Sequence, residues 1–158
     1  MDSVSNGLIW FSAISAGIMA GVYFTFSVFA MRSFAELGDE AGARAMQSIN
    51  RVIQQSAFLP LFFLSTLTSA ALVVLGFFGM AGTRPEMAIA GGGVYVVGMF
   101  VVTVVGNVPL NNKLDAADPA SEEGKAVWAD YLARWTRLNH VRTLACTASL
   151  ALLIGALG

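Results

Sequence analysis

Four long segments of this chain contain no Asp, Glu, Lys or Arg, and together they cover most of its length. They are residues 7–31, 52–83, 87–112 and 143–158. A helix rises 1.5 Å per residue, so about 20 mostly apolar residues cross the hydrocarbon core of a bilayer. The first three segments are long enough, and the fourth needs its upstream neighbours as well. The pattern predicts an all-α fold, an integral membrane four-helix bundle with cytoplasmic helical extensions.

Breaks between these segments predict the helix boundaries. We expect a single transmembrane domain over residues 1–158, with helices over about 6–37, 55–80, 87–111 and 119–157. Asp39 is typical of an N-cap, and it begins an amphipathic stretch that either lies at the membrane interface or continues into the second helix. Asp118 and Pro119 are typical of a helix start. From there to the C-terminus only isolated glycines interrupt the pattern, which predicts one long helix.

The composition is typical of a membrane protein, and it excludes several kinds of functional site. The chain is 56% hydrophobic and 12% charged, whereas soluble domains are about 25% charged. The net charge of −1 gives no reason to expect a nucleic-acid partner. A single cysteine, Cys146, excludes an internal disulfide, and a single histidine, His140, excludes every two-histidine metal motif. No metal site is predicted.

Basic residues predict how the chain is oriented. Eight of the nine fall in the first and third connections or at the start of the last apolar segment: Arg32, Arg44, Arg51, Lys113, Lys125, Arg134, Arg137 and Arg142. Only Arg84 lies between the second and third segments. Because basic residues that flank membrane helices stay in the cytoplasm, we expect both termini outside and the protein in the plasma (inner) membrane.

Two short segments carry most of the polarity that membrane insertion does not explain. In the first, Asn107 and Asn111 are four residues apart and share a helix face, and Pro109 leaves the carbonyl of Val105 without its usual partner. The second gives one helical stripe that consists of Trp128, Tyr131, Trp135, Asn139 and Arg142. His140 lies about 100° from Asn139 on that helix. A stripe that faced lipid would be aliphatic.

These two segments meet on the cytoplasmic side, where Asn50, Arg51 and Arg32 are expected too, so topology predicts a polar pocket there. Simpler interpretations remain open at this point. Arg142 can extend to the headgroups, the tryptophans can form an interfacial belt, Asn107 can pack between helices, and His140 can lie at the interface. Several polar groups in hydrocarbon are costly without partners, which favours a shared network.

Three parts of the chain resemble a membrane family of unknown function that includes the anthrone oxygenases. They are AGVYFTFSVFAMRSF followed by AMQSIN, then NVPLNNKL, then W-x6-W-x3-NHVRTL. The matching motif positions are Asn107, Pro109, Asn111, Trp128, Trp135, Asn139 and Arg142. Arg32 and Ser33 stand where the family usually has Met-Pro. The resemblance implies a small four-helix membrane protein, and for characterised members the oxidation of an anthrone by O2 without an obvious cofactor.

This chemistry suggests roles for the pocket residues. Trp128, Tyr131 and Trp135 would stack on flat rings, with Asn107, Asn111 and Asn50 as further substrate-binding residues. Arg142, Asn139 and Asn107 would donate to the developing oxyanion. His140 is the default base, because its ordinary pKa is the only one near neutrality.

The leading hypothesis is therefore a membrane oxygenase that oxidises a flat, lipophilic, anthrone- or phenol-like substrate with O2. No cofactor is expected, although ligation of haem by His140 stays open. Whether the chain is an enzyme at all is also open. The alternatives are non-catalytic binding or carriage of lipophilic aromatic molecules, and an accessory subunit of another membrane enzyme. The bilayer is the expected partner, and homo-oligomerisation is left open.

Overall fold

The computed structural model describes residues 3–158, and every regular element in that range is helical. In chain order the elements are α1 (Ser3–Thr25), η1 (Phe26–Ala30), α2 (Met31–Glu36), α3 (Asp39–Ile53), α4 (Phe58–Phe77), α5 (Pro85–Tyr95), η2 (Val96–Asn107), α6 (Val108–Ala116) and α7 (Glu122–Gly155). The two η elements are π-helical, and each joins its neighbours without a break. The predicted all-α fold is confirmed.

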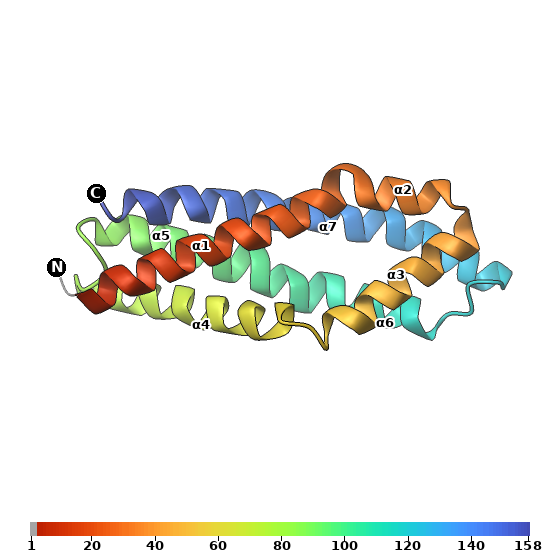
Figure 1. Cartoon of the computed structure of the whole chain (residues 1–158), viewed down its shortest axis with the longest axis horizontal. Helices are drawn as coiled ribbons and strands as arrows, with labels where there is room; N and C mark the ends of the chain where they lie inside the picture. The colour runs from red at the N-terminus through yellow and green to blue at the C-terminus, as the bar shows by residue number, and fades with distance from the viewer. Residues whose placement is uncertain (1–2) are drawn as a thin grey trace.

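Four continuous helices run along the molecule (Figure 1). They are Ser3–Glu36, Phe58–Phe77, Pro85–Ala116 and Glu122–Gly155, and each is long and apolar enough to cross a membrane. The start of α1 and the C-terminus lie at one end, beside the connection between α4 and α5. The opposite end, formed by α2, α3, α6 and the first half of α7, is called here the charged end.

Observed helix bounds differ from the expected ones by a few residues. The first helix already begins at Ser3, and the third continues to Ala116. The second stops at Phe77 because the chain turns at Gly79, which has a positive φ of 69°. The last helix starts at Glu122, not at Pro119.

The start of α7 is a correction with a clear cause. Ser121 is the N-cap, and its hydroxyl accepts a hydrogen bond from the Gly124 amide at 2.9 Å. Asp118 instead uses its carboxylate to accept the Ala120 amide at 3.1 Å, which makes a turn just before the helix. Beyond Glu122 the helix is unbroken for 34 residues, so the predicted continuity from Trp135 to Arg142 is confirmed.

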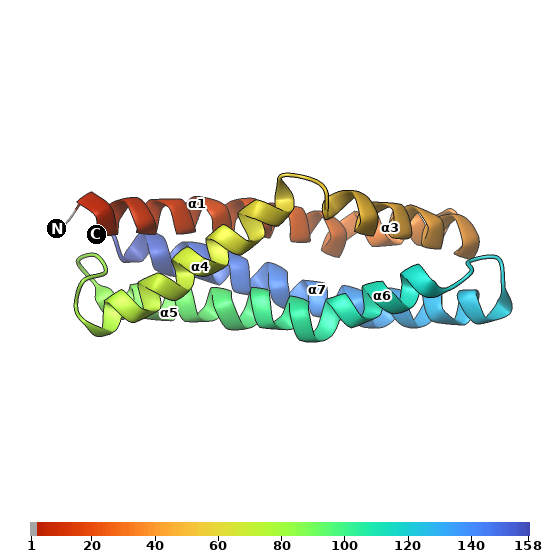
Figure 2. The same cartoon turned by 90° about the horizontal axis from the view of Figure 1, so that it is seen from below.

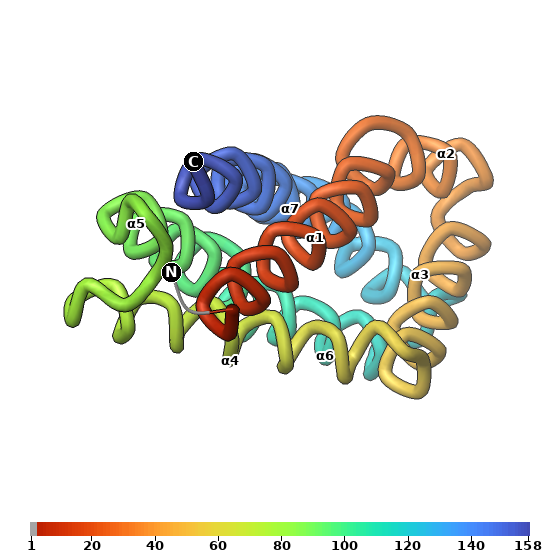
Figure 3. Tube along the Cα trace, turned by 60° about the vertical axis from the view of Figure 1, so that its left-hand side comes forward, coloured from red at the N-terminus to blue at the C-terminus, as the bar shows by residue number. Residues whose placement is uncertain are grey.

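Helix α3 is a separate element that bridges two of the long helices at the charged end (Figure 3). Gly38, with a φ of 90°, turns the chain from α2 into α3. Gly38 is the N-cap of α3, and Asp39, which was expected to be the cap, is the first residue of the helix. After Ile53 the chain turns again before α4 begins at Phe58. Of the two expected alternatives, direct continuation into the second transmembrane helix is therefore wrong.

Helix α4 crosses the bundle at an angle. Figure 2 shows that it passes from the side of α5, near the termini, to the side of α1, near α3. Gly92 of α5 permits close packing at the crossing, because a Cβ there would meet the carbonyl oxygen of Ser69 and the Val73 side chain.

Candidate functional site

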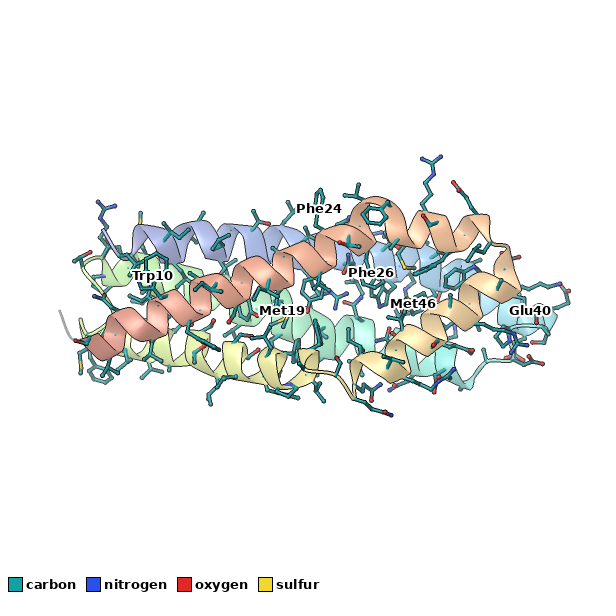
Figure 4. The ribbon with its side chains drawn as sticks, in the orientation of Figure 1. Trp10, Met19, Phe24, Phe26, Glu40 and Met46 are labelled. Atoms are coloured by element: carbon teal, nitrogen blue, oxygen red, sulfur yellow. The ribbon has the colours of Figure 1, made fainter. Side chains whose placement is uncertain are left out.

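A pocket of about 340 Å³ lies where the apolar half of the bundle meets the charged end. Its walls come from α1, η1, α3, α4, η2, α6 and α7, so residues far apart in sequence share it. The lining is mostly apolar, and it includes Phe26 of η1 and Met46 of α3, which approach each other across this region (Figure 4). The polar lining residues are Tyr23, Asn50, Gln54, Thr103, Asn111, Asn112 and Arg142, together with the indole of Trp135.

Arg142 is the charged group of this pocket, and it is only 4% exposed. Its Nη2 donates to Asn139 Oδ1 at 2.7 Å, and its Nη1 donates to Thr103 Oγ1 at 3.3 Å. The guanidinium lies 4.2 Å from the centre of the Tyr23 ring and 5.0 Å from that of Trp135. Two aromatic faces and two polar partners thus hold the cation in place. Arg142 does not extend to the headgroups.

Asn139 positions Arg142 and joins α7 to the first helix. Its Nδ2 donates to the Tyr23 carbonyl at 2.6 Å and to Ser27 Oγ at 2.8 Å, while its Oδ1 accepts from Arg142. Asn139 is fully buried, and these three hydrogen bonds satisfy both of its amide hydrogens and its oxygen. It lies behind the lining and does not border the pocket itself.

Asn111 fixes two aromatic side chains of α7 in a similar way. Its Oδ1 accepts hydrogen bonds from Tyr131 Oη at 2.8 Å and from Trp135 Nε1 at 2.9 Å. Trp128, Tyr131 and Trp135 stack on one another, with ring centres 5.9 and 5.7 Å apart. They are buried, so the alternative of an interfacial belt is wrong.

The stacking also limits which of these rings can meet a ligand. Trp135 lines the pocket, whereas Trp128 and Tyr131 lie beyond it toward the charged end. Their role as direct substrate platforms is not supported by this geometry, because each already has a ring against its face. Asn107 is buried behind Trp135 and donates to the Trp135 carbonyl at 3.3 Å, so it also supports the lining from outside the pocket.

His140 lies on the exposed face of α7 and does not line the pocket. The reason is helical geometry: Asn139 faces the interior, and the next residue is rotated about 100° away. The expectation that His140 is the base of the site therefore loses its geometric support, and so does haem ligation inside this pocket.

Several pocket residues were not anticipated from the sequence. Tyr23, Thr103 and three phenylalanines of α4, Phe58, Phe62 and Phe63, all line the cavity. Tyr23 and Phe26 lie within the first segment quoted for the family resemblance, which was the available signal. The α4 phenylalanines lie in a helix that is apolar all round, so no periodicity marked their inward face.

Three hydrogen-bonding groups of the lining have no partner among residues 3–158. They are the Tyr23 hydroxyl, Asn50 Nδ2 and Arg142 Nε. They come from α1, α3 and α7, all are buried, and all can donate a hydrogen bond. An unpaired buried donor is costly, so these three groups, whose own atoms are covered, are a concentration of unsatisfied polarity beside the cavity.

The part of the chain that holds most of the site matches a known protein family. A family model described as Anthrone oxygenase matches residues 50–152, which is more than half of the chain. The chain belongs to the anthrone oxygenase family. No curated protein and no solved structure matches it. The matched range begins at Asn50 and contains Asn107, Asn111, Asn139 and Arg142, whereas Tyr23 lies outside it.

Metal-ligating side chains form no cluster in the part of this family member that the structure describes. Within residues 3–158, no group of three or more His, Cys, Asp or Glu side chains could hold a metal ion. What the arrangement offers instead is one buried cation, hydrogen-bond donors and aromatic walls. Those features suit a planar ligand that acquires negative charge on an oxygen.

Proposed function

We propose that this protein is a membrane oxygenase that oxidises an anthrone, or a similar flat phenolic compound, to the quinone with O2. The observation that carries the proposal is the buried Arg142 guanidinium, which lines a mostly apolar pocket and is held there by Asn139, Thr103 and two aromatic rings. Membership of the anthrone oxygenase family supports this reaction class. The pocket volume of about 340 Å³ suits a ligand of three fused rings.

In this proposal the ligand oxygen points toward Arg142. The rings lie among Phe26, Phe58 and Phe62, with the Trp135 edge beside them. A guanidinium keeps its charge under all physiological conditions, so it favours the anionic form of the substrate. Asn139 and Thr103 hold Arg142 in position before the substrate arrives, so no reorganisation is needed as charge develops.

The chemistry balances without any other reactant. Loss of one proton from the methylene carbon of anthrone gives an anion whose charge rests largely on the carbonyl oxygen. This anion transfers one electron to O2, and the resulting radical and superoxide combine into a peroxide anion at that carbon, which takes up a proton from water to give the hydroperoxide. Loss of the second C–H proton with cleavage of the O–O bond forms the new carbonyl. One anthrone and one O2 therefore give one anthraquinone and one water.

No side chain that ordinarily titrates near neutral pH lines the pocket. We therefore propose that Arg142 makes the substrate acidic enough to lose its first proton to water. Gln54 and Asn112 are exposed polar members of the lining, and they offer the route by which that proton leaves. Because eight of the nine basic residues lie toward this side of the protein, we propose that the polar side faces the cytoplasm and that the protein lies in the plasma membrane.

Oxygen consumption by the purified protein in lipid nanodiscs tests the proposal. Addition of anthrone should start O2 uptake and anthraquinone formation in equal amounts, faster than in empty nanodiscs. The alternative, a carrier or accessory protein for lipophilic aromatic molecules, is favoured by the lack of a neutral-pH base in the lining. It predicts saturable anthrone binding with O2 uptake no faster than that in empty nanodiscs.

A further inference from the structure

The pocket has an opening, and the residues at this opening form two distinct edges. Phe63 of α4 and Val104 of η2 line the pocket, yet they are 55% and 46% exposed. Val108, at 38%, continues this edge. Gln54 and Asn112 are the exposed polar lining residues on the side of the charged end. The opening therefore has an apolar edge and a polar edge.

The apolar edge lies at the depth of the hydrocarbon core. Helix α4 has 20 residues, which is about the length that crosses this core, so both of its ends lie near the interfaces. Phe63 is five residues from the start of α4, or about 8 Å inside the nearer interface. Val104 precedes Lys113, the next charged residue, by nine positions, or about 13 Å along the helix. Both side chains thus face acyl chains.

Aromatic packing fixes how far the opening extends toward the termini. The rings of Phe62 and Phe63 lie 5.6 and 6.5 Å from the ring of Phe100 of η2, measured between centres. These contacts close the space between α4 and η2 on that side. The gap left between the two helices begins at Phe63 and Val104 and ends at the polar edge.

We propose that the ligand reaches the pocket sideways from the bilayer, through a portal between α4 and η2 that Phe63 and Val104 border. The ligand class is a planar phenol or anthrone dissolved in the hydrocarbon phase; its identity rests on the function proposed above. The apolar edge admits the rings, while the polar edge leaves a separate path for protons and water. Exposed apolar side chains beside a mostly apolar pocket that contains a buried cation fit this combination.

Binding kinetics test the portal directly. Anthrone is added without O2 to the protein in nanodiscs, and quenching of tryptophan fluorescence follows its association and release. Val104→Trp and Phe63→Trp should slow association and release together by tenfold or more, because a narrower portal hinders both directions. The matched controls are Val105→Trp and Leu64→Trp, at neighbouring lipid-exposed positions outside the lining. Both controls should bind as the wild type does.

Val104→Ala provides the opposite change, and it should accelerate both rates. The proposal is overturned if Val104→Trp matches Val105→Trp in both rates, or if affinity falls while association stays unchanged. Slower exchange in the portal variants, together with no O2 uptake by the wild type, contradicts the proposed oxygenase function and leaves the portal standing. If the wild type oxidises anthrone but the portal variants bind and release it at the wild-type rates, the portal is contradicted and the oxygenase function stands. A wild type that binds no anthrone contradicts both.

Discussion

At the scale of single residues, the site is organised around a buried guanidinium. A charged side chain inside a membrane protein is costly unless it is paired, and Arg142 is compensated by Asn139, Thr103 and the faces of Tyr23 and Trp135. A lysine ammonium is a compact point charge that cannot reproduce this forked and stacked geometry. The arginine is therefore specific to the arrangement, not only to its charge.

Arg142→Lys is expected to reduce protein-dependent anthrone oxidation by about 10- to 100-fold, since a hydrogen bond to a charged group contributes about 1.5–3 kcal/mol. His140→Gln is the matched control on the same helix, and it should oxidise anthrone within twofold of wild type, because His140 is exposed and outside the lining. Steady-state O2 uptake checks both variants. A large loss in His140→Gln would restore the base role expected from the sequence, and full activity in Arg142→Lys would contradict the oxyanion role.

Asn111→Ala is expected to destabilise the fold. The change removes the shared acceptor of Tyr131 Oη and Trp135 Nε1, and each buried donor left unpaired costs about 1–3 kcal/mol. Asn112→Ala, at the exposed neighbouring position, should leave the unfolding temperature nearly unchanged. Thermal unfolding in one detergent compares the two. Equal unfolding temperatures for both variants would show that the two hydrogen bonds contribute nothing to stability.

At the scale of elements, the inward face of a helix could be predicted only where its sequence has a helical period. The stripe from Trp128 to Arg142 was visible in the sequence because polar and aromatic residues recur there every three or four positions, and α7 is unbroken. The inward faces of α1 and α4 were not visible, since both helices are apolar throughout and show no amphipathic period. Tyr23 and the α4 phenylalanines were therefore missed.

The π-helical elements η1 and η2 were also absent from the prediction. They flank the site, with Tyr23 just before η1 and Asn107 at the end of η2, where the Val108 amide bonds to the Thr103 carbonyl five residues back. π-Helical turns often occur at functional sites. The sequence of these segments, rich in valine and phenylalanine, contains no pattern that distinguishes a π-helix from an α-helix.

Gly92→Ala and Gly93→Ala test the packing of these elements. A methyl group at Gly92 would press on the Ser69 carbonyl and Val73, whereas one at Gly93 meets nothing within 4 Å. Replacing glycine by alanine inside a helix otherwise gains up to about 1 kcal/mol. We therefore expect a lower unfolding temperature for Gly92→Ala and an equal or higher one for Gly93→Ala. The reverse order would contradict the close contact between α4 and α5.

At the scale of the whole molecule, polarity divides the bundle along its length. The ion pairs Arg51–Asp115, Lys113–Asp130 and Arg134–Asp130 all lie at the charged end, on exposed side chains, so each contributes little to stability. The uncharged segments between the charged residues sufficed to predict the four long helices. The opening between α4 and η2 could not be predicted, because it depends on the angle at which α4 crosses.

The orientation stays a prediction that labelling can test. Ala120→Cys and Glu86→Cys place exposed thiols at opposite ends of the molecule. In intact cells, a membrane-impermeant thiol reagent should label Glu86→Cys but not Ala120→Cys, because the charged end is expected inside. Cys146 is buried and serves as the unlabelled background. Labelling of Ala120→Cys alone would reverse the topology.

The central claim is that the pocket around Arg142 catalyses transfer of oxygen from O2 to an anthrone. The most direct measurement is mass spectrometry of the product formed under O2 labelled with the heavy isotope, with empty nanodiscs to subtract spontaneous oxidation. The account predicts protein-dependent anthraquinone that carries one heavy oxygen atom, and much less of it with Arg142→Lys. Product formed no faster than in empty nanodiscs, or protein-dependent product whose new oxygen comes from water, would contradict it.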